Sequence, residues 1–157
     1  TETMHLLRAE KGYIIVGQDT DGTVTPLDLN LNWMIGKKKN DFIGKRSLTR
    51  SDIIKSDRKQ LVGLLPLNKA YGIEEGQHVI EEEDLSTPIK TPIKMLGQVT
   101  SSYFSPTLNH CVALALIKGG NRKIGSQLFV STSNLNTIAV EVVKPNFIDP
   151  TNERLTS

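Results

Sequence analysis

The segment "LLRAEKG" (residues 6–12) places one carboxylate between two basic side chains, directly after apolar residues. Glu10 is the group in this segment that could do chemistry, because an ionised carboxylate accepts hydrogen bonds at both of its oxygens. An ordinary solvated glutamate at the end of a helix has the same local sequence. Taken by itself, the segment favours this second interpretation, and the rest of the chain has to decide between the two.

Other ionisable groups that could bind metal are scattered along the chain. His5, His78 and His110 are far apart and do not cluster with carboxylates at the spacing of metal ligands, which favours structural or surface roles. Asp19 and Asp21 resemble part of a calcium loop. However, a glycine comes directly after Asp21 and the later bidentate glutamate is missing, so a plain turn is predicted.

Nucleophile and nucleotide motifs are equally sparse. Cys111 begins an apolar run and is predicted to be a small buried hydrophobic residue rather than a nucleophile. The sequence has no phosphate-binding loop, no dinucleotide-binding glycine fingerprint and no nucleophile elbow. The residues by themselves predict no self-contained catalytic site, so we assign no catalytic residue and no metal ligand.

Composition limits the class of protein. The 157 residues suffice for one or two small domains, and 38% hydrophobic with 23% charged residues is typical of globular proteins. A net charge of +2 is too small to predict nucleic-acid binding. A single cysteine suits a reducing compartment, and no apolar run approaches the roughly 20 residues of a membrane span. We therefore expect a cytoplasmic location, and we interpret the Thr-Glu-Thr start as a point within a longer protein.

The first part of the chain carries mixed signals. Residues 3–11 are weakly amphipathic, and the run "YIIV" (13–16) predicts a buried strand because it is β-branched and flanked by glycines. Residues 41–52 predict a short helix that Asp41 caps. The aromatic side chains of Tyr13 and Trp33 are expected to pack in a core.

From about residue 58 the pattern becomes uniformly β. Short apolar runs are separated by glycines and prolines, which is typical of an antiparallel barrel or sandwich. The predicted strands are residues 60–66, 77–83, 94–101, 111–117, 127–132 and 137–143. We place a domain boundary near residue 57 and assign the chain to the α+β class.

Four long stretches together resemble the aminomethyltransferase family, which includes the glycine-cleavage T-protein. They contain its Leu-Arg-x-Glu-x-Gly, Gly-x-Asp-x-Asp, Leu-x-Trp and Thr-Ser…Ser-Pro-x-Leu patterns, in the same order and over nearly all of the chain. The stretches are "LLRAEKGYIIVGQDTD" (6–21), "TPLDLNLNWMIGKKKNDFIGKRSL" (25–48), "LGQVTSSYFSPTLNHCVALALI" (96–117) and "AVEVVKPNFIDPTNERL" (139–155). The resemblance implies the end of a folate-binding domain (1–57) followed by a mostly antiparallel β-barrel domain (58–157).

Within this family, segments such as "RAEKGYIIVGQDTDGTVTP" and "RKQLVGLL" resemble the alpha subunits of heterotetrameric sarcosine oxidase. This likeness implies the tetrahydrofolate-binding part of an enzyme that demethylates sarcosine oxidatively to glycine and captures the carbon as 5,10-methylenetetrahydrofolate. NAD and flavin are then expected elsewhere in the complex, with the remainder of the alpha subunit and the other subunits as partners. Alternatives are the tail of a glycine-cleavage T-protein or of a dimethylglycine or sarcosine dehydrogenase.

The resemblance also implies two binding residues. The glutamate of Leu-Arg-x-Glu contacts the pterin in this family and falls on Glu10. The family's arginine for the folate tail lies six residues after the tryptophan, which here is Lys39. The alternative is that Lys37 or Lys38 shares this contact. Lysine keeps the charge of arginine but loses its two-pronged geometry. One alternative is therefore a vestigial folate site, with the barrel as a subunit-docking module. For the three lysines, a hydrated connector is the alternative.

The catalytic aspartate of the family lies before the Leu-Arg-x-Glu pattern and is therefore not in this sequence. The resemblance thus implies that the 157-residue chain alone is inactive.

Overall fold

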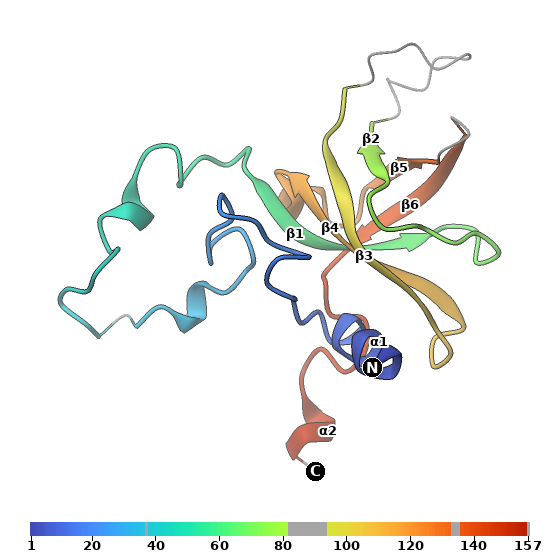
Figure 1. The fold of residues 1–157 in the computed structure, drawn as a ribbon, viewed down its shortest axis with the longest axis horizontal. Coiled ribbons are helices and arrows are strands. Elements are labelled where there is room, and N and C mark those ends of the chain that lie inside the picture. Colours follow the sequence, from blue (N-terminus) through green and yellow to red (C-terminus); the bar gives the residue numbers. More distant parts are fainter. Residues whose placement is uncertain (37, 82–93, 133–135, 157) are drawn as a thin grey trace.

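Short apolar runs with turn residues between them form a closed barrel of six antiparallel strands (Figure 1). A computed structural model describes residues 1–36, 38–81, 94–132 and 136–156. The strands are β1 Lys59–Pro66, β2 His78–Ile80, β3 Gly97–Ser105, β4 His110–Lys118, β5 Gln127–Ser131 and β6 Thr137–Val143. Their order around the barrel is β1-β4-β3-β2-β5-β6. The predicted β-barrel is confirmed.

The predicted strand positions agree closely for β1, β4, β5 and β6. The third run begins and ends later than predicted, because β3 is Gly97–Ser105 rather than residues 94–101. Residues 82 and 83 of the second predicted run lie outside the described residues.

The continuous apolar run of β4 is explained by burial on both of its faces. Ala113 and Ala115 belong to the cluster of side chains inside the barrel. Leu114 and Leu116 point the other way, as successive strand residues must, and pack with Leu29 in a second cluster outside it. The segment before the barrel therefore covers the outer surface of β1 and β4.

Helix α1 (Glu2–Glu10) packs against β3 and β4. The other helical elements are short. They are the 3-10 helices η1 Asn32–Met34, η2 Ser47–Thr49 and η4 Gly120–Lys123, and α2 Glu153–Thr156. None of the helices in the described ranges is long and apolar enough to cross a membrane.

The predicted strand at residues 13–16 is wrong. Val16 is 84% exposed, and Asp19 N donates back to the carbonyl of Ile15, so the chain turns here instead of extending. Gly12 and Gly17 both have positive φ and bend the backbone at each end of the run. Among the described residues its only ladder partner is the single bridge from Val16 to Thr20, so the apolar run has no sheet to join.

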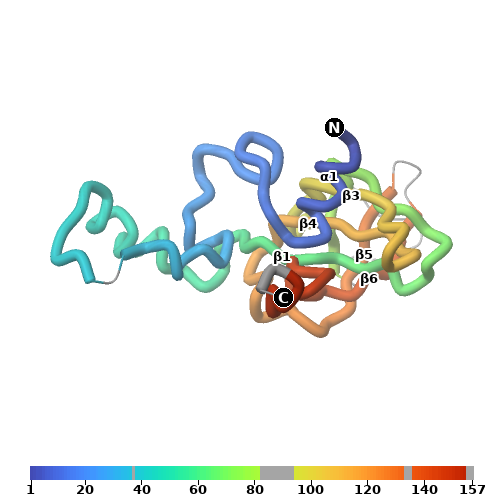
Figure 2. Tube along the Cα trace, turned by 90° about the horizontal axis from the view of Figure 1, so that it is seen from below, coloured from blue at the N-terminus to red at the C-terminus, as the bar shows by residue number. Residues whose placement is uncertain are grey.

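The predicted helix at residues 41–52 is also wrong, because only the 3-10 turn Ser47–Thr49 forms there. This region belongs to an arm (residues 32–36 and 38–55) that extends away from the barrel in both views (Figures 1 and 2). Trp33 lies on the arm and is 72% exposed, and Tyr13 is 56% exposed, so neither packs in the core as expected. The domain boundary near residue 57 stays a prediction.

Candidate functional site: a buried carboxylate between α1 and the barrel

Glu10 is the last residue of α1 and is only 4% exposed. Ser105 Oγ, at the end of β3, donates a hydrogen bond of 2.5 Å to Glu10 Oε1. Among the described residues no other hydrogen bond reaches this carboxylate. The interpretation of Glu10 as a solvated surface glutamate is therefore wrong, and the carboxylate keeps acceptor capacity that the described residues do not use.

The backbone at Glu10 is held by the segment that follows β6. The amides of Phe147 and Ile148 donate to the Glu10 carbonyl at 2.9 and 3.0 Å. Lys11 Nζ donates to the carbonyl and carboxylate of Asp149 at 2.8 and 3.0 Å. These contacts satisfy a carbonyl at the end of α1, where helical partners run out, and they fix the position from which the Glu10 side chain begins.

Two structural features require a glycine at position 12, the last residue of the Leu-Arg-x-Glu-x-Gly pattern. Gly12 has a φ of +74°, a conformation that residues with a Cβ rarely adopt. A Cβ built on it would lie 2.5 Å from the carbonyl oxygen of Pro145, which is closer than atoms can approach. The glycine of the pattern therefore allows the segment after β6 to pass close to the end of α1.

A second buried carboxylate, Asp19, also contacts β3. Asp19 is fully buried, and Arg8 Nη1 contacts its Oδ2 at 2.5 Å. Thr100 and Ser101 of β3 each donate to Asp19 Oδ1 at 2.6 Å, and the amide of Ile15 donates to Oδ2 at 2.9 Å. Every one of these donors stabilises an ionised carboxylate, so Asp19 serves as an anchor between the loop and β3.

The hydrogen bonds of Glu10 and Asp19 connect the sequence patterns of the N-terminal segment with that of the barrel. The Leu-Arg-x-Glu and Gly-x-Asp segments supply Glu10 and Asp19, and the Thr-Ser…Ser-Pro segment of the barrel supplies the hydroxyls that bind them. The sequence does not predict that Arg8 pairs with Asp19 or that Ser105 pairs with Glu10. Their presence in the quoted patterns was the available signal, but the pairing of distant segments is not readable from spacing.

A third buried carboxylate joins the N-terminal segment to the start of β1. Arg58 donates to both oxygens of Asp28, from Nε at 2.8 Å and from Nη2 at 2.7 Å. The Thr25 amide and hydroxyl each donate to Asp28 Oδ2 at 2.8 Å. Burial raises the pKa of the Asp28 carboxyl, but the bonds from Arg58 and Thr25 outweigh it and hold the pKa below its ordinary value. The bond to Asp28 in turn raises the pKa of Arg58.

Lys39 lies in the arm, and its side chain is exposed. Its amide donates to the carbonyl of Gly36 at 3.3 Å. Within the described residues no hydrogen bond or ion pair joins Lys39 to Glu10. Lys38 is exposed as well, and Lys37 lies outside the described residues. The structure therefore brings Ser105 to Glu10 but does not bring the lysines to it.

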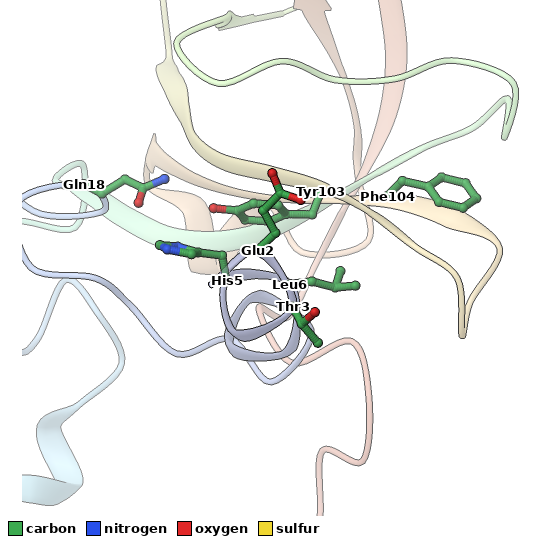
Figure 3. Close-up of a pocket in the computed structure, with 7 residues that line it drawn as sticks. All are labelled: Glu2, Thr3, His5, Leu6, Gln18, Tyr103 and Phe104. Atoms are coloured by element: carbon green, nitrogen blue, oxygen red, sulfur yellow. The ribbon is translucent and has the colours of Figure 1, made fainter.

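An open cavity of about 600 Å³ lies on the neighbouring surface, between α1 and β3. Figure 3 shows its lining side chains, which are Glu2, Thr3, His5, Leu6, Gln18, Tyr103 and Phe104. The rings of His5 and Tyr103 are 6.4 Å apart, and the Arg8 guanidinium lies 5.6 Å from the centre of the Tyr103 ring. The cavity wall is thus continuous with the Arg8–Asp19 network.

Cys111 and two of the histidines lie within the barrel strands. Cys111 is 5% exposed and packs among the side chains inside the barrel, which confirms the prediction of a buried hydrophobic role. His110 is buried at the start of β4, and His78 is exposed on β2. No cluster of three or more potential metal ligands occurs among the residues that the structure describes.

Comparison with known proteins adds independent findings. The family model of the glycine cleavage T-protein C-terminal barrel domain matches residues 59–149, and the GCVT N-terminal domain model matches residues 1–39. The sarcosine oxidase subunit alpha of Corynebacterium sp. (strain P-1) is 52% identical over 128 residues, which are 82% of this chain and 13% of that protein. The aminomethyltransferase of Nitrosomonas europaea is 36% identical over 143 residues, which are 90% of this chain and 36% of that protein.

A solved structure agrees with these sequence matches. The crystal structure of the glycine cleavage system aminomethyltransferase T from Bartonella henselae superimposes with a TM-score of 0.76 at 26% identity. The match covers 93% of this chain and 38% of that one. The chain therefore spans only a minor part of the length of each of these relatives.

Proposed function

The chain belongs to the glycine cleavage T-protein (aminomethyltransferase) family, and from this premise we propose that it forms part of a tetrahydrofolate-binding region. We further propose that the whole protein is an alpha subunit of the sarcosine oxidase type. Such an enzyme demethylates sarcosine oxidatively to glycine and captures the carbon as 5,10-methylenetetrahydrofolate. The likeness to a sarcosine oxidase alpha subunit at 52% identity supports this proposal.

The observation that carries the proposal is the buried, partly unused carboxylate of Glu10. A reduced pterin presents a ring N–H and an exocyclic NH₂ side by side, and a carboxylate can accept both at once, as it does from an arginine. Ser105 uses one of about four lone-pair positions on this carboxylate. Since buried polar groups rarely remain without partners, Glu10 fits a ligand that brings a pair of donors.

For the other end of the folate, we propose Lys39 as the contact to the carboxylates of the glutamate tail. Its exposed position on the arm suits a flexible, solvent-facing tail. Because a lysine offers a point charge without the two-pronged geometry of arginine, this contact is expected to be weak.

Tetrahydrofolate supplies the acceptor for the one-carbon unit, and the residues of this chain bind and orient it. NAD and flavin belong to other parts of the complex in this proposal. The partners are then the remainder of the alpha subunit and the other subunits. We expect the 157-residue chain alone to have neither oxidase nor transferase activity.

The test is Glu10→Gln in the complete subunit, with tetrahydrofolate affinity measured by titration. Loss of a charge-assisted pair of hydrogen bonds should cost about 1–3 kcal/mol, or about one to two decades of affinity. Oxidation of sarcosine should continue, with free formaldehyde replacing methylenetetrahydrofolate as product. Glu141→Gln, at an exposed position of β6, is the control and should leave affinity unchanged. An unaltered affinity in Glu10→Gln would contradict the proposal.

A subunit-docking module with a vestigial folate site is the second candidate function. The observation that favours it is the apolar surface of the arm, where Trp33, Met34 and Ile43 are all strongly exposed. Under this alternative, Trp33→Ser weakens subunit assembly in size-exclusion chromatography, while Glu10→Gln leaves folate affinity unchanged.

A further inference from the structure

Ser105 and Glu10 are 95 residues apart in the sequence and touch in the structure through a hydrogen bond of 2.5 Å. Both side chains are buried, with Ser105 fully so. A bond this short from a hydroxyl to a carboxylate belongs to the strong, charge-assisted class. The barrel therefore acts directly on the side chain that the proposed function assigns to the pterin.

The direction of the Ser105 proton is determined by its second hydrogen bond. The amide of Leu108 donates to Ser105 Oγ at 3.1 Å, within the turn that joins β3 to β4. A hydroxyl has one proton to donate, and with Leu108 as donor at the oxygen this proton is directed to Glu10. The turn thus presents a donor with fixed orientation, because Ser105 also pairs with His110 in the barrel ladder.

Buried packing and one hydrogen bond to the carboxylate hold the Glu10 side chain. Its carbonyl is fixed by the amides of Phe147 and Ile148, but these bonds do not restrict rotation of the side chain. Within the described residues, Ser105 is the only hydrogen-bond donor to its carboxylate. Among the described residues, Ser105 is therefore the hydrogen-bonding group that can orient the carboxylate plane.

We propose that Ser105 is a positioning residue, which holds the Glu10 carboxylate in the orientation that accepts both pterin donors. The proposal rests on the proposed function of Glu10 and deepens it. The serine uses one lone pair of Oε1, which leaves Oε2 and the remaining lone pair of Oε1 as acceptors for the ligand. Pre-organisation of this kind raises affinity because the ligand does not have to order the side chain.

The test is Ser105→Ala in the complete subunit, with two probes, tetrahydrofolate and a tetrahydropterin that lacks the glutamate tail. Both affinities should fall by the same factor of about ten, because the altered contact is to the shared ring. Ser102→Ala is the matched control. It removes a hydroxyl from the same strand that donates to the carbonyl of Ile73 instead of Glu10, and it should change either affinity less than about twofold.

A double-mutant cycle distinguishes positioning from a general structural effect. In the Glu10→Gln background, Ser105→Ala should reduce affinity much less than in the native background, since the oriented group is already altered. A purely structural role predicts equal losses in both backgrounds, which would overturn the inference. If Ser105→Ala does not fold, Ser105→Cys repeats the measurement with a side chain of similar shape and a weak donor.

The two proposals fail in different ways. If Glu10→Gln weakens binding and Ser105→Ala does not, the positioning role is wrong and the proposed function stands. If Glu10→Gln has unchanged affinity, both are wrong.

Discussion

Arg8 and Asp19 form a buried ion pair, with a guanidinium nitrogen 2.5 Å from a carboxylate oxygen and side chains 11% and 0% exposed. The pair lies between α1 and β3, because Arg8 Nη2 also donates to Ser101 at 2.7 Å. Through Asp19 the pair reaches Thr100 as well. The pair thereby joins the loop and the barrel to α1, the helix that carries Glu10.

Arg8→Met should destabilise the chain strongly, because it leaves the Asp19 charge buried without its counter-ion. The expected loss is about 3–5 kcal/mol in the free energy of unfolding, measured by urea titration of the chain. Arg50→Ala is the control, since its ion pair with Asp52 has side chains 66% and 52% exposed. An exposed pair contributes at most about 1 kcal/mol. Equal losses in the two variants would show that the Arg8–Asp19 pair is not a buried anchor.

Asp28 should make the stability of the chain fall in acid. Its pKa is below the ordinary value of 3.8 in the fold, through the bonds from Arg58 and Thr25 that outweigh the effect of burial. A depressed pKa stabilises the fold above the pKa of the unfolded state, and this contribution is lost as the pH falls through the folded-state pKa. Asp28→Asn should lower stability at pH 7 by about 3 kcal/mol, and its difference from the native chain should shrink below about pH 4.

The control for this measurement is Asp57→Asn, at the exposed position directly before Arg58. Its stability should agree with that of the native chain within about 0.5 kcal/mol. The free energy of unfolding is measured by urea titration from pH 7 to pH 3. If its difference between the native chain and Asp28→Asn does not change with pH, the stabilising role of the ionised Asp28 carboxylate is wrong.

Gly12→Ala should be more destabilising than Gly17→Ala, although both glycines have positive φ, +74° and +94°. The backbone strain of alanine at such a φ is about 1–2 kcal/mol at either position. Only at Gly12 does the new Cβ meet another segment, the carbonyl of Pro145 at 2.5 Å, whereas nothing lies within 4 Å at Gly17. This clash should add about 1–3 kcal/mol. Equal losses in thermal unfolding would mean that the final segment moves aside at no cost.

Lys39→Ala in the complete subunit should weaken tetrahydrofolate binding by about two- to fivefold, as is typical of an exposed charge pair. The effect should fade in high salt, because exposed charges are screened over about 10 Å at 0.1 M. Affinity for the tetrahydropterin without a tail should not change. Lys69→Ala, at an exposed position after β1, is the control and should leave affinity unchanged. Lys39→Arg should bind more tightly because arginine can donate two hydrogen bonds to one carboxylate. An unchanged affinity for tetrahydrofolate in Lys39→Ala would remove Lys39 from the site.

The barrel could be predicted from the sequence because a local pattern of residues marks each of its strands. Each run, such as residues 137–143, carries apolar residues bounded by turn formers, and β6 is Thr137–Val143 as predicted. The same reasoning failed for residues 13–16, which have a strand-like composition. Composition reports a preference for extended backbone, but a strand also needs a neighbour to accept its hydrogen bonds, and the turns at Gly12 and Gly17 remove that possibility.

The candidate site was also predicted only in part from the sequence. The resemblance of residues 6–21 to a family pattern is enough to predict Glu10 as a binding residue. That Glu10 is buried, and that Ser105 donates to it, depends on the folding of α1 against β3. Residues 95 positions apart have no shared local pattern, and their contact exists only because barrel closure and helix packing bring their backbones together.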